Sequence, residues 1–154
     1  MVMAFVVVRV GVRMRVVVRV RIAGQRDGGA VVNIGSVAGI NANRGSLTHS
    51  VTKAALAQMT RVMASDLAPR VRVNAVLPGA IETESLRWWL DEKAPGARDL
   101  MAANTPMRRN GTPDDIAAAV LYLSSPAAAW VTGKLFEIDG GALGPVLEND
   151  HPDL

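Results

Sequence analysis

Three side chains that can donate or accept a proton lie close together in the sequence: the hydroxyl of Ser36, the imidazole of His49 and the amine of Lys53. His49 precedes Lys53 by four residues, so both would lie on one face of a helix. The ammonium would lower the pKa of His49 below its ordinary value of ~6.5, leaving a mostly neutral ring that can donate from one nitrogen. Taken singly, Ser36 is typical of a loop or cap hydroxyl, His49 of a solvated helix residue and Lys53 of a surface cation. Only their joint spacing makes them a candidate catalytic site.

Two predicted elements would position these side chains. Residues 30–34 are a short apolar run between glycines, the form of a buried parallel strand, and Ser36 follows its carboxyl end. Open sheets bind ligands at that end of their strands. A helix over about residues 46–67 would carry His49 and Lys53 and end before Pro69. Such a helix would have an apolar stripe made of Leu47, Val51, Ala54, Ala55, Met59, Val62 and Met63.

The remaining pattern predicts an α/β domain. Residues 70–77 form a second strand closed by a Pro-Gly pair, and residues 82–111 form a polar excursion with one or two short helices. Thr112 and Pro113, followed by two aspartates, open a helix that continues to about Ser124. Residues 135–138 form a last strand. Strands and helices that alternate with short joints predict a parallel sheet with right-handed crossovers.

The first 27 residues differ in composition from the rest. They hold six arginines against one aspartate, a net charge of +5, whereas residues 28–154 hold 11 basic and 13 acidic side chains, a net charge of −2. Apolar residues fill every even position from 8 to 22, which predicts a strand with one cationic face, although typical strands have only about 5–6 residues. The alternative is a biased segment that arises from a different start site or reading frame. The expected division is an arm of residues 1–27, a domain of residues 28–141 and a polar tail of residues 142–154.

Composition also excludes several classes of function. The chain has no cysteine, so disulfides, thiolate metal sites and a cysteine nucleophile are excluded, and a reducing cytoplasm fits. The sequence has no apolar run of about 18 residues, so no membrane span is predicted. It has no small-residue cleavage site after its apolar start, so no secretory signal is predicted. No nucleic-acid binding is expected, because residues 28–154 lack a basic stripe with interleaved aromatic residues. The spacing of His, Asp and Glu predicts no metal site.

Five short segments, taken in order, resemble the landmarks of the short-chain dehydrogenase/reductase family. The resemblance covers about residues 28–141, and the segments are residues 33–36 (Asn-Ile-Gly-Ser), 49–53 (His-Ser-Val-Thr-Lys), 72–74 (Arg-Val-Asn), 78–83 (Pro-Gly-Ala-Ile-Glu-Thr) and 133–141, which end in Asp-Gly-Gly. Within the family, residues 78–83, 104–111 and 125–133 are most similar to the 7α-hydroxysteroid dehydrogenases and the neighbouring 3-oxoacyl reductases.

The resemblance implies a truncated Rossmann-like three-layer fold with a partial parallel sheet. It implies NAD(P)-dependent hydride transfer to or from a small-molecule carbonyl or secondary alcohol, with steroids among the candidate substrates. Ser36 would hold the substrate oxygen, and Lys53 would hold the nicotinamide ribose. His49 stands where the family has its acid/base tyrosine. The resemblance also implies that the nicotinamide and its carboxamide would be lined by Pro78, Gly79, Ile81 and Thr83.

The chain departs from the family at two places. Imidazole is shorter than the phenol it replaces at position 49, and a misplacement of about 1 Å can cost roughly 100-fold in rate. The family's glycine-rich turn, which lets backbone amides approach the pyrophosphate, is absent, since only 27 residues precede the matching region. We therefore expect weak NAD(P) binding. The alternative function is a catalytically inactive fragment or pseudoenzyme with a role in oligomerisation or binding.

Without the family's first unit, the sheet would have an exposed apolar edge that needs a partner. The arm could supply a replacement strand. The helix over residues 46–67 could instead pair with its copy in a second chain, as in the family's dimers, and residues 133–141 could join a tetramer contact. A homo-oligomer is therefore expected. Trp88 and Trp89 lie in the excursion that forms the family's substrate lid, where they either meet a ligand or partner or cover the core.

Overall fold

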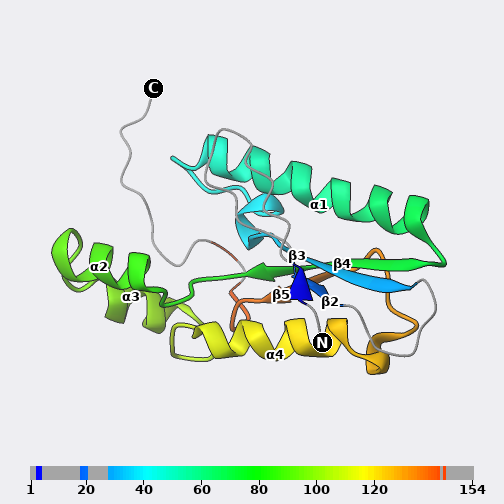
Figure 1. Ribbon diagram of the computed structural model, residues 1–154. Helices are drawn as coiled ribbons and strands as arrows, with labels where there is room; N and C mark the ends of the chain where they lie inside the picture. The colour runs from blue at the N-terminus through cyan, green and yellow to red at the C-terminus, as the bar shows by residue number, and fades with distance from the viewer. Residues whose placement is uncertain (1–2, 5–17, 21–27, 143, 145–154) are drawn as a thin grey trace.

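The computed structural model describes residues 3–4, 18–20, 28–142 and 144, and a single mixed sheet lies at its centre (Figure 1). The strand order is β1-β2-β3-β4-β5. The parallel part consists of β3 (Gly29–Ile34), β4 (Val71–Pro78) and β5 (Leu135–Ile138). The strands β1 (Met3–Ala4) and β2 (Val18–Val20) continue the sheet in antiparallel pairing beyond β3. The predicted parallel strands are confirmed.

Helices cover both faces of this sheet. The long helix α1 (Leu47–Leu67) lies on one face and α4 (Pro113–Ser124) on the other (Figure 1). The short helices α2 (Glu84–Glu92) and α3 (Ala97–Asn104) project past the carboxyl end of β4 and form the predicted excursion. Two 3-10 turns, η1 (Val37–Gly39) and η2 (Pro126–Ala128), follow β3 and α4. The arrangement is the three-layer α/β fold expected from the sequence.

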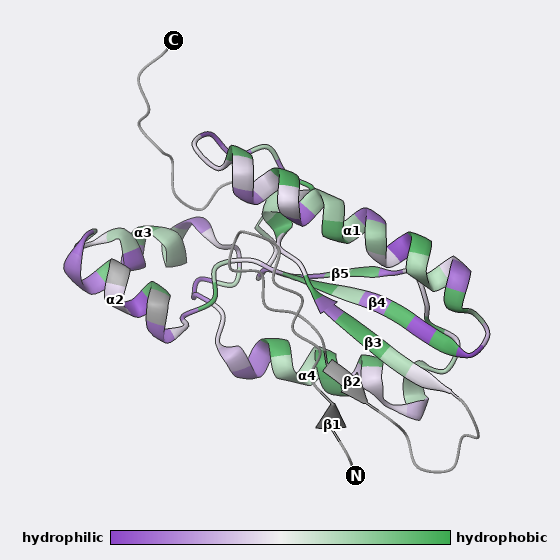
Figure 2. Cartoon of the chain, turned by 45° about the horizontal axis from the view of Figure 1, so that its top comes forward, coloured by the Kyte–Doolittle hydropathy of each residue, from purple (hydrophilic) through white to green (hydrophobic). Residues whose placement is uncertain are grey.

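The core on the α4 side is built from branched side chains of the strands. Val32, Val76, Leu123 and Ala128 are fully buried there, and apolar residues of β5 and α4 pack around them. Figure 2 shows these apolar segments of β3 and β4 lying between α1 and α4. Burial of a Val or Leu side chain contributes about 1.5–3 kcal/mol, so this cluster holds α4 against the sheet.

Local signals at its amino end explain why α4 begins at Pro113. Thr112 caps the helix by accepting a hydrogen bond from the backbone N–H of Asp115, and the Asp115 carboxylate accepts from the backbone N–H of Thr112. Arg109 donates two hydrogen bonds to the same carboxylate, which holds the pKa of Asp115 well below its usual range. The predicted bounds of α4 are confirmed. They could be predicted because these contacts lie within a few residues of the helix start.

The predicted apolar stripe of α1 is not the face that packs on the sheet. The residues that α1 buries against the sheet are Leu56, Ala57, Thr60 and Ala64. Leu47 is 78% exposed and Val51 59% exposed, and Met59 and Val62 are also exposed. Small side chains let the helix backbone approach the sheet closely, so the less hydrophobic face became the buried one. None of the described helices is long and apolar enough to cross a membrane.

Strand β2 lies beside β3, at the edge for which the sequence suggested an added strand. It pairs antiparallel with β3, with Val18 opposite Val32, Arg19 opposite Val31 and Val20 opposite Ala30. Residues 30–32 of β3 are therefore paired on both sides, with β2 and with β4. The rest of the strand predicted over residues 8–22, and the tail from residue 145 onward, lie outside the described residues.

Candidate active site

Ser36 lies directly after β3, at the carboxyl edge of the parallel strands. The preceding Gly35 donates its backbone N–H to the carbonyl of Val76 at 2.7 Å, which keeps the chain against β4. A Cβ atom at Gly35 would come within 2.3 Å of the Leu77 side chain, so a larger residue there would require that side chain to move. Ser36 then caps η1, because its Oγ accepts from the backbone N–H of Ala38 at 3.2 Å. Its own hydroxyl proton has no acceptor among the described residues.

Lys53 reaches the same edge of the sheet from α1. Its side chain is half-buried, and Nζ donates to the carbonyl of Ile34 at 3.0 Å. Burial lowers the pKa of Lys53 from its ordinary value. The ammonium therefore lies at the last residue of β3, two residues before Ser36, and among the described residues its other two protons have no acceptor.

His49 lies one turn before Lys53, near the start of α1, and is exposed. Its pKa is lowered, first by partial burial and second by the charge of Lys53. The direction agrees with the sequence prediction, but the larger cause is burial and not the ammonium. Ser46 and Ser50 share a hydrogen bond of 2.9 Å in this first turn, and Ser46 also donates to the carbonyl of Asn43. At neutral pH the arrangement presents a neutral imidazole, a hydroxyl and an ammonium.

The segment predicted to line the nicotinamide follows β4, the neighbour of β3. Gly79 donates its N–H to the carbonyl of Ile138 at 3.0 Å, and a Cβ atom there would come within 2.8 Å of Asp139. Ile81 forms a parallel bridge with Gly111. Thr83 accepts from the backbone N–H of Leu86 through its hydroxyl, so it caps α2. Because Ile34 and Val76 are in register, this segment and Ser36 share one edge of the sheet.

A pocket of about 190 Å³ opens beside this segment. Its lining combines the ends of β4 and β5 with the loop before α4, and includes Ala80, Ile81, Thr105, Met107, Ile138 and Gly140. Ser36, His49 and Lys53 do not line it. Sequence reasoning missed this pocket because Gly140 approaches Thr105 only through the tertiary fold, where a Cβ at Gly140 would come within 2.6 Å of the threonine.

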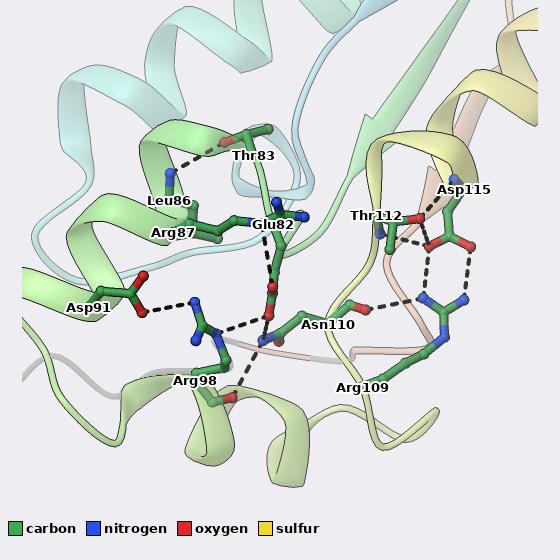
Figure 3. Close-up of polar contacts among 10 residues, drawn as sticks. All are labelled: Glu82, Thr83, Leu86, Arg87, Asp91, Arg98, Arg109, Asn110, Thr112 and Asp115. Carbon is green, nitrogen blue, oxygen red and sulfur yellow. Dashed lines mark hydrogen bonds and ion pairs between the residues drawn. The ribbon is translucent and has the colours of Figure 1, made fainter.

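Glu82 connects the helices α2 and α3 to this segment (Figure 3). Its carboxylate accepts a hydrogen bond from Asn110 Nδ2 at 3.1 Å and pairs with Arg98 Nε at 3.3 Å and with Arg87 Nε at 3.8 Å. Arg98 also pairs with Asp91 at 3.0 Å. Sequence reasoning missed this cluster, because scattered charges in a polar excursion carry no signal of which ones meet.

Comparisons with known proteins cover most of this chain. Residues 12–142 match the family model described as enoyl-(acyl carrier protein) reductase. The chain is 49% identical over 127 residues to an uncharacterized oxidoreductase of Mycobacterium tuberculosis (strain CDC 1551 / Oshkosh), which covers 82% of this chain and 48% of the relative. It is 40% identical over 120 residues to the 7α-hydroxysteroid dehydrogenase of Escherichia coli (strain K12), covering 77% and 46%.

A solved structure is similar to this chain in both sequence and fold. The structure of a 7α-hydroxysteroid dehydrogenase complexed with NADH and 7-oxo glycochenodeoxycholic acid is 38% identical and superposes with a TM-score of 0.71. The match covers 79% of this chain and 47% of that protein. The chain thus spans about half the length of the curated relatives it matches.

Proposed function

The chain belongs to the short-chain dehydrogenase/reductase family, and from this premise we propose that it serves NAD(P)-dependent hydride transfer to or from a carbonyl or secondary alcohol. The observation that carries the proposal is the contact of Lys53 Nζ with the Ile34 carbonyl, which sets an ammonium at the end of β3, two residues before Ser36, on the strand that pairs with β4. When bound, the nicotinamide supplies or takes up the hydride.

The donor groups at this edge suit the nicotinamide end of such a cofactor. Lys53 uses one N–H on Ile34, and its two remaining protons can bind ribose hydroxyls. Pro78, Gly79, Ile81 and Thr83 belong to the end of β4 and the segment that follows it, and they would line the ring and its carboxamide. A half-buried ammonium is a strong donor, because water competes less well for it there.

We assign the hold on the substrate oxygen to Ser36 and the proton transfer to His49. Ser36 would donate a hydrogen bond from its hydroxyl to the substrate oxygen and keep its proton. His49 would exchange a proton with the same oxygen through its ring, which stays neutral at pH 7 because its pKa is lowered. Imidazole is shorter than a phenol, so His49 would act at less than optimal reach.

The proposed substrate is a small apolar carbonyl or alcohol of steroid type. The similarity to a 7α-hydroxysteroid dehydrogenase supports this class. Trp88 of α2 is 58% exposed and Met107 is exposed beside the pocket, so the excursion offers apolar surface for a ring system. Lys93 Nζ lies 5.7 Å from the Trp88 ring centre and covers only part of it.

We also propose that the protein acts as a homo-oligomer through α1. The face opposite its buried residues has an exposed stripe made of Leu47, Val51, Met59 and Val62, which we call the α1 stripe. Exposed apolar stripes of this kind are typical of interaction surfaces. A further subunit contact through residues 133–141 stays a prediction. The cytoplasmic location, which we expect from the absence of cysteine, also stays a prediction.

Substitution at position 49 tests the proposed activity. We expect the His49→Tyr protein to reduce ketones with NADH or NADPH about 100-fold faster in kcat/KM than the unchanged protein, because a longer phenol restores the reach. His49→Phe is the matched control, since it has the ring without the hydroxyl and should show no gain. The activity proposal fails if the unchanged protein and the His49→Tyr protein both reduce no ketone of a broad panel and both leave NADH fluorescence unchanged. That result would favour the inactive-fragment alternative.

A further inference from the structure

A buried polar pair joins α1 to β3 at some distance from the candidate catalytic side chains. Asn33 is 2% exposed and Thr60 is fully buried, and Asn33 Nδ2 donates to Thr60 Oγ1 at 2.9 Å. The hydroxyl proton of Thr60 is committed to the carbonyl of Leu56 at 2.8 Å. Thr60 therefore meets Asn33 as an acceptor only, and the helix must present that oxygen in one orientation.

A second close contact lies at the other end of the same interface. Gly39, at the end of η1, faces the backbone of α1 so closely that a Cβ atom would come within 2.7 Å of the Lys53 carbonyl carbon and 2.9 Å of the Ala54 nitrogen. Because backbone atoms cannot move aside as side chains can, only glycine allows this approach. We call this contact the Gly39 seat.

These contacts involve the helix that carries Lys53 and the strand that Ser36 follows. Asn33 is on β3, three residues before Ser36, and Thr60 is seven residues after Lys53 on the same face of α1. Seven helical residues span about 10 Å. A single contact would let α1 pivot or slide along β3, whereas two contacts about two turns apart set both its position and its rotation.

We propose that Asn33 and Thr60 are positioning residues: their hydrogen bond and the Gly39 seat hold α1 on β3 so that Lys53 Nζ stays at the Ile34 carbonyl beside Ser36. The relevance of this placement to catalysis rests on the proposed function, but the placement itself does not.

The chemistry of the pair favours positioning over stability. Replacing both partners of a buried hydrogen bond by apolar groups of similar shape can be nearly neutral, so a Leu and Val pair would serve the core as well. Apolar surfaces tolerate small sliding movements, whereas a hydrogen bond loses its strength when the donor–acceptor distance or angle changes. The polar pair thus adds direction to a contact that packing alone would leave loose.

The pKa of Lys53 reports this placement without any cofactor or substrate. The chain has three lysines, so a titration followed by NMR of labelled lysine side chains gives few signals, and the Lys53 signal of the unchanged protein is the reference for each variant. Burial lowers the pKa of Lys53 below its ordinary value. His49 is the neighbouring titratable group, and it is neutral throughout the pH range in which lysine titrates.

Three variants separate positioning from stability. We expect the Asn33→Leu/Thr60→Val protein to be folded and of similar stability. Its Lys53 pKa should rise by ~0.5 unit or more toward the ordinary value of a lysine, because the side chain becomes more hydrated. Thr60→Ser keeps the hydroxyl and should keep the original pKa of Lys53. Gly39→Ala leaves every polar group in place but pushes α1 away, so it should raise the Lys53 pKa as well.

An unchanged Lys53 pKa in the folded double variant would show that the hydrogen bond is only structural and would overturn the proposal. If that variant does not fold, Gly39→Ala decides, and an unchanged Lys53 pKa there overturns the proposal equally. Failure here is distinct from failure of the proposed function, because the titration needs neither NAD(P)H nor a ketone.

Discussion

His49 is the residue on which the proposed activity depends most. It stands where a family tyrosine is expected, near enough to Lys53 for the ammonium to affect its titration. Burial and the Lys53 charge both favour the neutral ring. A neutral imidazole can accept a proton from an alcohol, and the imidazolium that forms can return a proton to a carbonyl oxygen.

The titration of His49 predicts a pH dependence of stability. Its pKa in the folded chain lies below the unfolded value of ~6.5, so the unfolded chain binds more protons between these two values. Stability is therefore present above pH ~6.5 and is lost as the pH falls from there through the folded pKa. In His49→Gln we expect a smaller loss of the urea midpoint between pH 7.5 and pH 5, measured by circular dichroism.

His151→Gln is the control for this measurement, because it removes the only other histidine from the polar tail. It should leave the pH dependence unchanged. An equal loss of stability in the His49→Gln and unchanged proteins would show that the pKa of His49 is not lowered on folding.

At the scale of elements, the excursion of α2 and α3 depends on electrostatic contacts. Glu82 joins Asn110, Arg98 and Arg87, and Arg98 also binds Asp91 of α2. The Glu82 side chain is only 23% exposed, so salt screens its ion pairs less than it screens ion pairs at the surface. Glu82 lies between Ile81 and Thr83, so the same carboxylate connects both short helices to the segment predicted to line the nicotinamide.

Removal of this charge should loosen the two helices. In Glu82→Gln we expect amide hydrogen exchange in α2 and α3 to be about fivefold faster, which corresponds to ~1 kcal/mol, while exchange in β4 stays unchanged. Glu92→Gln is the matched control, since it removes an exposed acid from α2 outside this cluster. Equal exchange rates in the two variants would mean that Glu82 does not hold the excursion.

At the scale of the whole molecule, the α1 stripe and the edge of the sheet determine what the chain can bind. Strand β2 pairs with residues 30–32 of β3, so the described sheet does not offer that part of the edge to a partner. The α1 stripe has no such cover within the described residues, and it lies on the face of α1 turned away from the sheet. Association through this helix therefore follows from the fold more directly than association through β3.

A charge on the α1 stripe should separate the subunits. We expect the unchanged protein to be larger than a monomer by size-exclusion chromatography with light scattering, and Val51→Lys to shift it to a monomer, because a buried unpaired ammonium costs several kcal/mol. Leu100→Lys, which changes an exposed leucine of α3, should leave the mass unchanged. A folded monomer before any substitution would contradict the proposed oligomer.

Local signals explain which elements could be predicted from the sequence. Thr112, Pro113 and Asp115 define the start of α4 through contacts within a few residues, and the apolar run before an Asp-Gly-Gly turn defines β5. The candidate pair of His49 and Lys53 was also predictable, because a spacing of four residues determines a shared helix face. These features depend on the chain near each residue and on little else.

The sequence by itself determined the parallel α/β architecture, the bounds of its main elements and the types of the candidate catalytic side chains. Only the tertiary structure decided which face of α1 is buried, that Asn33 meets Thr60 and that Glu82 joins α2 to α3. The reason is physical: hydrophobic periodicity marks the most apolar face of a helix, whereas burial follows the side chains that allow the closest packing. Contacts between residues far apart in the chain exist only once the elements have packed.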